Sequence, residues 1–113
     1  MDVKRGYMAF QDQHYAPTAI SATFPPIVTL VAHGLQNGQR LRATRFPIYP
    51  LANATGMEQL EGREFEVQKA TDDTFALYSI EGFPIDATSY TAFINNGLAQ
   101  LTRTGPELGY ENA

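Results

Sequence analysis

The chain has 113 residues, of which 43% are hydrophobic and 18% charged, and its net charge is −4. This size allows one domain with a modest core, and the composition is that of a globular chain. The acidic balance disfavours nucleic-acid binding, no apolar run is long enough for a membrane span, and the lack of cysteine excludes disulfides and thiolate metal sites.

The first 25 residues are predicted to form an arm followed by a lead-in strand. Residues 1–17 carry three aromatic side chains without regular alternation, which is typical of an arm that packs on the flank of its own domain or on a neighbouring subunit. Residues 19–24 favour a short strand, which ends at Pro25 and Pro26 because proline has no backbone donor. No long apolar core follows the start, so no signal peptide is expected.

Residues 27–32 and 40–44 are predicted to pair as a central β-hairpin. The first run is continuous and β-branched, which is typical of a strand buried on much of both faces. The second run alternates, with Leu41 and Ala43 on one face. Asn37 and Gly38 between the two runs tolerate the positive φ angles of a tight turn.

Beyond this hairpin, loops alternate with strands. Residues 45–55 contain Pro47 and Pro50 and favour a rigid apolar loop, since proline does not suit a central strand. Residues 63–70 and 74–80 are predicted to form a second hairpin, with Phe65, Val67, Phe75 and Leu77 facing inward. The remaining expected elements are a core plug at Met57 and Leu60, an excursion at 82–96 anchored by Ile85, Tyr90 and Phe93, and a closing strand at 98–102.

The number of strands indicates the architecture. Five or six short strands are too few for a sandwich of normal width, and rolling them into a barrel removes the exposed edges. The sequence therefore predicts an all-β fold, a small five- to six-stranded barrel at residues 26–103. Extended N- and C-terminal arms are expected at residues 1–25 and 104–113.

Several short motifs follow one another in a fixed order across residues 26–103. An apolar strand leads into His33-Gly34-Leu35 and Asn37-Gly38; then come Gly56-Met57-Glu58-Gln59-Leu60-Glu61-Gly62, Arg63-Glu64-Phe65-Glu66-Val67, Asp73-Thr74-Phe75-Ala76-Leu77, Ile85-Asp86, Tyr90-Thr91-Ala92-Phe93 and Gly97-Leu98-Ala99. This order resembles a β-barrel module found in structural proteins of tailed bacteriophages. The module is similar in fold to the first catalytic-cysteine half-domain of ubiquitin-activating enzymes. Because this chain has no cysteine, that second likeness implies a fold and not thioester chemistry.

The resemblance implies a non-enzymatic structural component of a tailed-phage virion, assembled in the host cytoplasm. Such a protein acts through contacts with other virion proteins and with copies of itself, and a neck or tail accessory role is favoured over head-surface decoration. The chain departs from the family at residues 45–55, where the connection is longer and Pro-rich. An alternative is a module that binds a host receptor or surface glycan through Tyr90, Phe93, Asn95 and Asn96.

No convergent set of catalytic, cofactor-binding or metal-binding residues is expected. His14 and His33 are the chain's histidines, too few for a zinc site without cysteine, and His33 is expected to bond the backbone of its turn. Asp72, Asp73 and Asp86 lack the spacing of a calcium loop and are interpreted as turn caps. No nucleophile elbow and no Gly-rich phosphate loop occurs, so the sequence predicts no enzyme and no cofactor.

Two groups of side chains remain. The cluster Arg40, Arg42 and Arg45 is interpreted as a solvated strand face rather than a nucleic-acid site. Protein interfaces favour aromatic residues, so subunit contacts are expected from the arm, the Pro-rich loop and the tail. The interface candidates are Tyr7, Met8, Phe10, Tyr15, Tyr49 and Tyr110.

Overall fold

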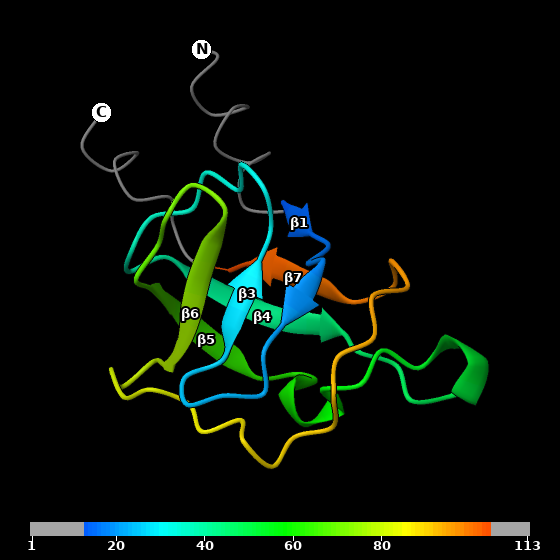
Figure 1. The fold of residues 1–113 in the computed structure, drawn as a ribbon. Coiled ribbons are helices and arrows are strands. Elements are labelled where there is room, and N and C mark those ends of the chain that lie inside the picture. Colours follow the sequence, from blue (N-terminus) through cyan, green and yellow to red (C-terminus); the bar gives the residue numbers. More distant parts are fainter. Residues whose placement is uncertain (1–12, 105–113) are drawn as a thin grey trace.

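A computed structural model describes residues 13–104 of the chain. In this part of the chain, seven antiparallel strands form one sheet in the order β1-β7-β4-β5-β6-β3-β2, curled into a half-barrel (Figure 1). The all-β prediction is confirmed, but the sheet has seven strands rather than five or six. The strands are β1 (His14–Tyr15), β2 (Ala19–Ile20), β3 (Ile27–Thr29), β4 (Arg40–Arg45), β5 (Glu64–Gln68), β6 (Thr74–Ser79) and β7 (Gln100–Arg103), with 3-10 helices η1 (Leu51–Asn53) and η2 (Glu58–Leu60) between β4 and β5.

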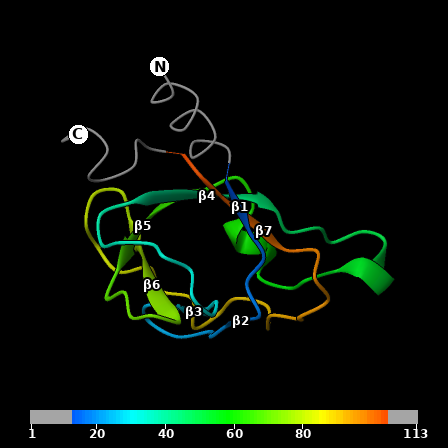
Figure 2. The ribbon, with the colours of Figure 1, turned by 90° about the horizontal axis from the view of Figure 1, so that it is seen from above.

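The two edge strands of the sheet, β1 and β2, are consecutive in the chain. The backbone N–H of Arg103 donates to Gln13 at 3.0 Å, and that of Thr18 donates to Thr29 at 3.0 Å. Residues 13–20 therefore pair first with β7 and then with β3, and the buried Pro17 lies between the two pairings. This segment links the two edges of the curled sheet (Figure 2). This linking segment covers edges that would otherwise be open to other chains.

The lead-in region differs from the prediction at this point. Residues 14–15 and 19–20 are strands of the sheet, which therefore starts well before residue 26, the predicted start of the barrel, and the strand expected at 19–24 ends at Ile20. The physical reason is burial, because Tyr15 and Ile20 both enter the hydrophobic core. Strands of two residues are too short to show alternation in a sequence. The remainder of the predicted arms, residues 1–12 and 105–113, lies outside the described residues.

The predicted central hairpin is wrong. β3 pairs with β2 and β6, whereas β4 pairs with β5 and β7, so two strands separate them in the sheet. Nor is β3 buried on both faces, since Ile27 is partly exposed beside a fully buried Val28. The turn residues instead hold a long connection across the end of the sheet, where the Asn37 side chain accepts a hydrogen bond from Ala70 N–H at 2.9 Å.

His33 anchors the same connection. Its Nδ1 accepts a hydrogen bond from Leu35 N–H at 2.8 Å, and its Nε2 lies 3.1 Å from the Thr74 carbonyl oxygen. The ring also packs edge-on against Phe75, with centroids 5.0 Å apart. The prediction that His33 bonds backbone groups is confirmed. Its contact with Thr74 extends beyond its own turn.

The second predicted hairpin is confirmed. β5 and β6 pair in antiparallel register, with Phe65 opposite Ser79 and Val67 opposite Leu77. The turn between them is held by the Thr71 hydroxyl, which accepts from Thr74 N–H at 3.0 Å. Asp73, expected to cap this turn locally, instead accepts from the distant Ala32 N–H at 3.0 Å.

The core fills the concave side of the curled sheet. Met57 and Leu60 are fully buried and plug one end, as predicted, and Ile85, Tyr90 and Phe93 attach the 82–96 excursion to the core. Apart from alanines, the side chains of the strands that are fully buried are Val28, Leu41, Phe65, Val67, Phe75, Leu77 and Leu101.

Candidate functional site

The segment from residue 46 to residue 56, hereafter the apolar loop, projects from the sheet after the end of β4 (Figure 1, right). Phe46 is buried at its start, with its N–H donating to the Glu61 carboxylate, and Thr55 is buried at its end. Thr55 N–H donates to the Pro47 carbonyl at 3.2 Å, so the two ends of the loop lie side by side. This is the geometry of an Ω-loop, a class of loop that is frequently functional.

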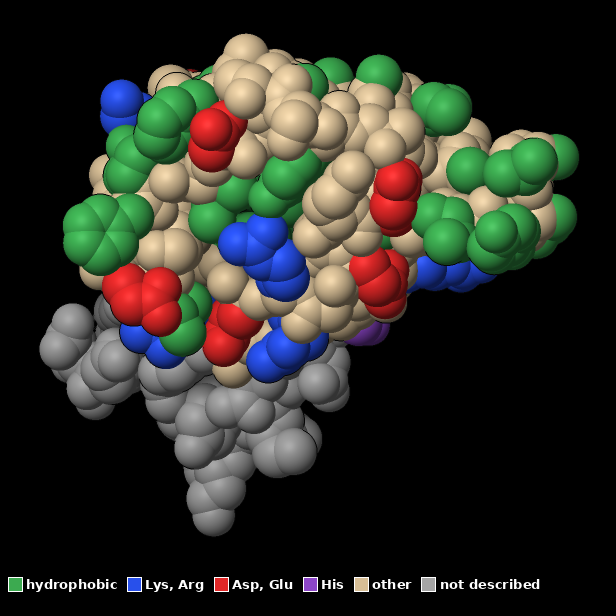
Figure 3. All heavy atoms as spheres, turned by 90° about the horizontal axis from the view of Figure 1, so that it is seen from below, with side chains coloured by type: hydrophobic (Ala, Val, Ile, Leu, Met, Phe, Trp, Pro, Cys, Tyr) green, Lys and Arg blue, Asp and Glu red, His purple; other side chains and the backbone are tan. Residues whose placement is uncertain are grey.

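The outer part of the apolar loop exposes large hydrophobic side chains. Leu51 is 79% exposed, Tyr49 75% and Ile48 43%, and η1 buries none of its residues. No charged residue occurs in the sequence from Phe46 to Met57. Hydrophobic side chains accordingly gather on the projection in the space-filling view (Figure 3). Exposed apolar surface that is concentrated in this way is typical of an interaction site.

The base of the apolar loop is held rigidly by residues 91–96. Ile94 N–H donates to Thr55 at 2.7 Å, and Met57 N–H donates to Thr91 at 3.0 Å. The Asn96 amide donates to the carbonyls of Asn53 at 3.2 Å and Ala54 at 3.0 Å. A loop that is fixed in this way loses little conformational freedom when it binds a partner.

Gly56 is required where the two segments meet. Its φ is +68°, and a Cβ added to it would lie 1.8 Å from the carbonyl oxygen of Ala92. Only glycine combines this left-handed backbone with so close an approach. The close packing of the loop base against residue 92 therefore depends on one glycine.

A hollow of about 290 Å³, hereafter the loop groove, lies between the apolar loop and the 91–94 segment. Its walls are mainly apolar, with Tyr49, Leu51 and Ile94 among them, and Glu58 supplies the charged group. The Glu58 carboxylate accepts a hydrogen bond from the Thr91 hydroxyl at 2.7 Å. A groove of this volume, apolar with one acidic side chain, suits one or two large side chains beside a cation.

The predicted interface residues fall in different places. Tyr49 lies on the apolar loop and is exposed, whereas Tyr15 is buried at 8% exposure in the core of its own chain. Tyr7, Met8, Phe10 and Tyr110 lie outside the described residues. The sequence prediction missed Ile48, Leu51 and Ile94. The uncharged run from Phe46 to Met57 is the sequence signal that points to the first two.

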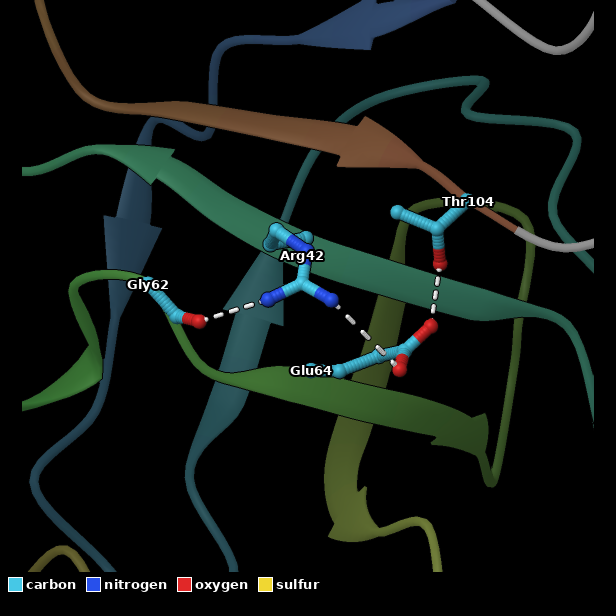
Figure 4. Close-up of polar contacts among 4 residues, drawn as sticks. All are labelled: Arg42, Gly62, Glu64 and Thr104. Atoms are coloured by element: carbon cyan, nitrogen blue, oxygen red, sulfur yellow. Dashed lines mark hydrogen bonds and ion pairs between the residues drawn. The ribbon is translucent and has the colours of Figure 1, made fainter.

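Arg42 of the arginine cluster lies on β4 with its side chain paired to groups of the neighbouring chain segments (Figure 4). Arg42 donates to the Gly62 carbonyl at 2.8 Å and lies 3.7 Å from the Glu64 carboxylate, which also accepts from the Thr104 hydroxyl at 2.6 Å. Arg40 stands opposite Glu66 in the strand register. Opposite charges in cross-strand positions support the interpretation of a solvated strand face.

A second hollow, of about 530 Å³, lies between the β3–β4 connection and the β5–β6 turn. His33 and Asp73 line it, but both already bond backbone groups. Within residues 13–104, no three His, Asp or Glu side chains come together where they would hold a metal ion. In the same part of the chain, no helix has the length and apolar character needed to cross a membrane.

We expect removal of divalent metal ions to leave the melting temperature unchanged, because the described residues offer no ligand cluster. Thermal unfolding with and without EDTA measures this directly. A fall of more than about 5 °C, which corresponds to roughly 1 kcal/mol for a domain of this size, would contradict the prediction.

Asp86 caps a turn as predicted, and its pKa is lowered. The Thr88 hydroxyl donates to the Asp86 carboxylate at 2.6 Å and Thr88 N–H donates to it at 3.1 Å, and both bonds favour the charged form. A carboxyl group whose pKa is lowered by folding stabilises the protein above its unfolded pKa, and this stability is lost as the pH falls through the folded pKa.

We therefore expect Thr88→Val to raise the pKa of Asp86 toward 3.8, its ordinary value, because the larger of the two hydrogen-bond effects is removed. An NMR titration of the Asp86 side chain measures this, with Ser89→Ala as the neighbouring control. The variant should lose a little stability at neutral pH and none below the folded pKa. An unchanged titration curve would show that the hydroxyl does not act on this carboxylate.

Comparison with known proteins gives no family. No family model matches the sequence, and no curated protein is significantly similar to it. The function is therefore inferred from the fold, the apolar loop and the chemistry of the chain's own residues.

Proposed function

We propose that this chain is a non-enzymatic structural component of a tailed-phage virion, assembled in the host cytoplasm, that acts through contacts with other virion proteins and copies of itself. The observation that carries the proposal is the projecting apolar loop. Leu51 and Tyr49 expose most of their surface to water, yet the base of the loop is fixed by a set of hydrogen bonds. A rigid projection with an uncharged apolar end is suited to bind another protein surface.

The place of the loop in the chain supports the same proposal. It occupies the connection after the second predicted strand, where the phage module that the sequence resembles has a short link. A short link would be enough to join β4 to the elements that follow. The added residues contribute little to the core beyond Phe46 and Thr55, so they are explained best by a contact outside the chain.

A neck or tail accessory role is favoured over head-surface decoration because the expected terminal arms and the apolar loop would give the chain two separate attachment regions. Its first and last residues lie together near the start of β4, since Arg103 N–H bonds Gln13 and Thr104 N–H bonds Arg40. The apolar loop follows the opposite end of β4. Two attachment regions at opposite ends suit a subunit that links neighbours in series, whereas a decoration protein needs one.

The contacts of the residues considered for glycan binding favour the structural role. Tyr90 and Phe93 pack against the core, and the Tyr90 hydroxyl accepts from Arg63 at 2.8 Å. The Asn96 amide is used to hold the apolar loop. An aromatic platform for a sugar needs exposed rings and free carboxamides, and three of these four side chains are engaged within the chain.

Purified particles of a phage that encodes this chain test the proposal. Wild-type protein should be found in the particles by mass spectrometry, in a fixed ratio to the other virion proteins. In a phage carrying Tyr49→Ser and Leu51→Ser together, the protein should remain in the lysate. Val31→Ser, which changes a comparably exposed residue away from the loop, is the matched control and should be incorporated normally.

Two results would contradict the proposal. Absence of the wild-type protein from purified particles would overturn the structural role itself. Normal incorporation of the double variant would show that the apolar loop is not the contact that brings the protein into the particle.

A further inference from the structure

We propose that the loop groove is the docking site for residues 6–10 of a second copy of this chain. The inference rests on the proposed function only in treating the protein as one that assembles, and it names the partner of the loop. It commits to one occupant, which is this segment of a neighbouring subunit, with one or two of its large side chains (Tyr7, Met8 and Phe10) inside the groove.

The chemistry of the segment matches that of the groove. Gly6-Tyr7-Met8-Ala9-Phe10 is uncharged and carries three large apolar or aromatic side chains, directly after Lys4 and Arg5. The groove is apolar along Tyr49, Leu51 and Ile94 and has the Glu58 carboxylate on one side. When the apolar side chains occupy the groove, Lys4 and Arg5 would therefore lie near the Glu58 carboxylate and be attracted to it. Charge complementarity of this kind fixes the register of a docked segment.

The direction of β1 indicates that the occupant comes from another copy. β1 is antiparallel to β7, and β7 is antiparallel to β4, so β1 and β4 run the same way. Gln13, the first described residue, therefore lies at the end of β4 that is remote from the apolar loop. The register that places Arg103 opposite Leu41 puts Gln13 level with the start of β4.

The distance from Gln13 to the loop groove also indicates that the occupant comes from another copy. From Leu41 to Phe46 the chain runs about 17 Å along the sheet, at about 3.4 Å per residue, before the loop even begins. Phe10 is three residues from Gln13 and reaches at most about 10 Å from it. The chain between Phe10 and Gln13 is therefore too short for Phe10 to reach the groove of its own subunit. The groove of a neighbouring subunit is not subject to this limit on distance.

Disulfide trapping between full-length copies tests the contact, because the natural chain has no cysteine. One copy carries Met8→Cys and a second, distinguishable by an isotope label, carries Leu51→Cys. The matched control replaces Leu51→Cys with Val31→Cys, which is 70% exposed but lies in the β3–β4 connection. Under mild oxidation the first mixture should give a mixed disulfide dimer at a yield at least about tenfold above the control.

Self-association in solution provides a second measurement. Analytical ultracentrifugation of the full-length chain should show that Tyr7→Ser with Phe10→Ser weakens self-association at least about tenfold, as should Leu51→Ser alone. The two changes made together should weaken it no further than either does, because they affect one contact.

Several results would overturn the docking. These are equal trapping at Leu51 and Val31, trapping mainly between two Leu51→Cys copies, and an internal disulfide in monomers that carry both cysteines. If trapping fails while wild-type protein is still present in purified particles, the docking is wrong and the virion role stands. If trapping succeeds and particles lack the protein, the docking stands and the virion role is wrong.

Discussion

Val67→Asp is expected to unfold the protein. Val67 is fully buried in β5, which pairs with both β4 and β6, and it faces the core opposite Leu77. The charged side chain that is buried in the described residues is Arg103 of β7, which already donates to the Gln13 side chain at 3.2 Å, and β4 lies between β7 and β5 in the sheet. Burying an unpaired charge costs several kcal/mol, which is a large part of the roughly 5–15 kcal/mol that holds a domain folded.

The same substitution at Val31 is the control for Val67→Asp. Val31 is 70% exposed, so Val31→Asp should change the free energy of unfolding by less than about 0.5 kcal/mol. Circular dichroism with urea or heat measures both variants. A cooperative transition for Val67→Asp close to that of the wild type would mean that the concave side of the sheet is not a dry core.

Gly56→Ala should have the second largest effect, about 3–5 kcal/mol of lost stability. Two costs add at this residue. The left-handed backbone costs a side chain about 1–2 kcal/mol, and a Cβ placed 1.8 Å from the Ala92 carbonyl oxygen forces two backbone segments apart, which costs a few kcal/mol more. The separation would also lengthen the hydrogen bonds that join residues 55 and 57 to residues 94 and 91.

Gly62→Ala separates these two costs. Gly62 also has a positive φ, of +78°, but a Cβ there would meet no atom within 4 Å. Its substitution should therefore cost about 1–2 kcal/mol, from the backbone conformation alone. Urea unfolding of both variants measures the difference between them. Equal losses would show that the loop base yields at residue 92 and is less rigid than its hydrogen bonds indicate.

The parts of the fold that the sequence predicted are those in which local pattern and long-range pairing agree. The β5–β6 hairpin has period-two alternation, a short turn and neighbouring partners, so its register follows from local chemistry. The pairing of β3 could not be predicted in this way. Its apolar run indicates a strand but says nothing of its partners, which are β2 and β6 rather than the next strand in the chain.

The candidate site was predicted only in part, for a related reason. Tyr49 stood out because protein interfaces favour aromatic residues. Leu51 and Ile48 did not, because aliphatic residues in so small a domain are expected to build its core. Their exposure depends on the hydrogen bond between Thr55 and Pro47 and on the hydrogen bonds of the Asn96 side chain. These contacts join residues that are distant in the sequence, so no local sequence pattern predicts them.

Residues 13–20 pair with two strands, β3 and β7, that leave the ribosome at very different times. Ile20 pairs with Val28, so β2 finds its partner almost as soon as it emerges, whereas His14 bonds Thr102 across 88 positions of the chain. Closing so long a stretch of chain has a substantial entropic cost and must wait for the last strand. During synthesis, β4 therefore keeps one edge unpaired until β7 arrives. A polypeptide released before residue 100 would retain that open edge and be prone to edge-to-edge aggregation.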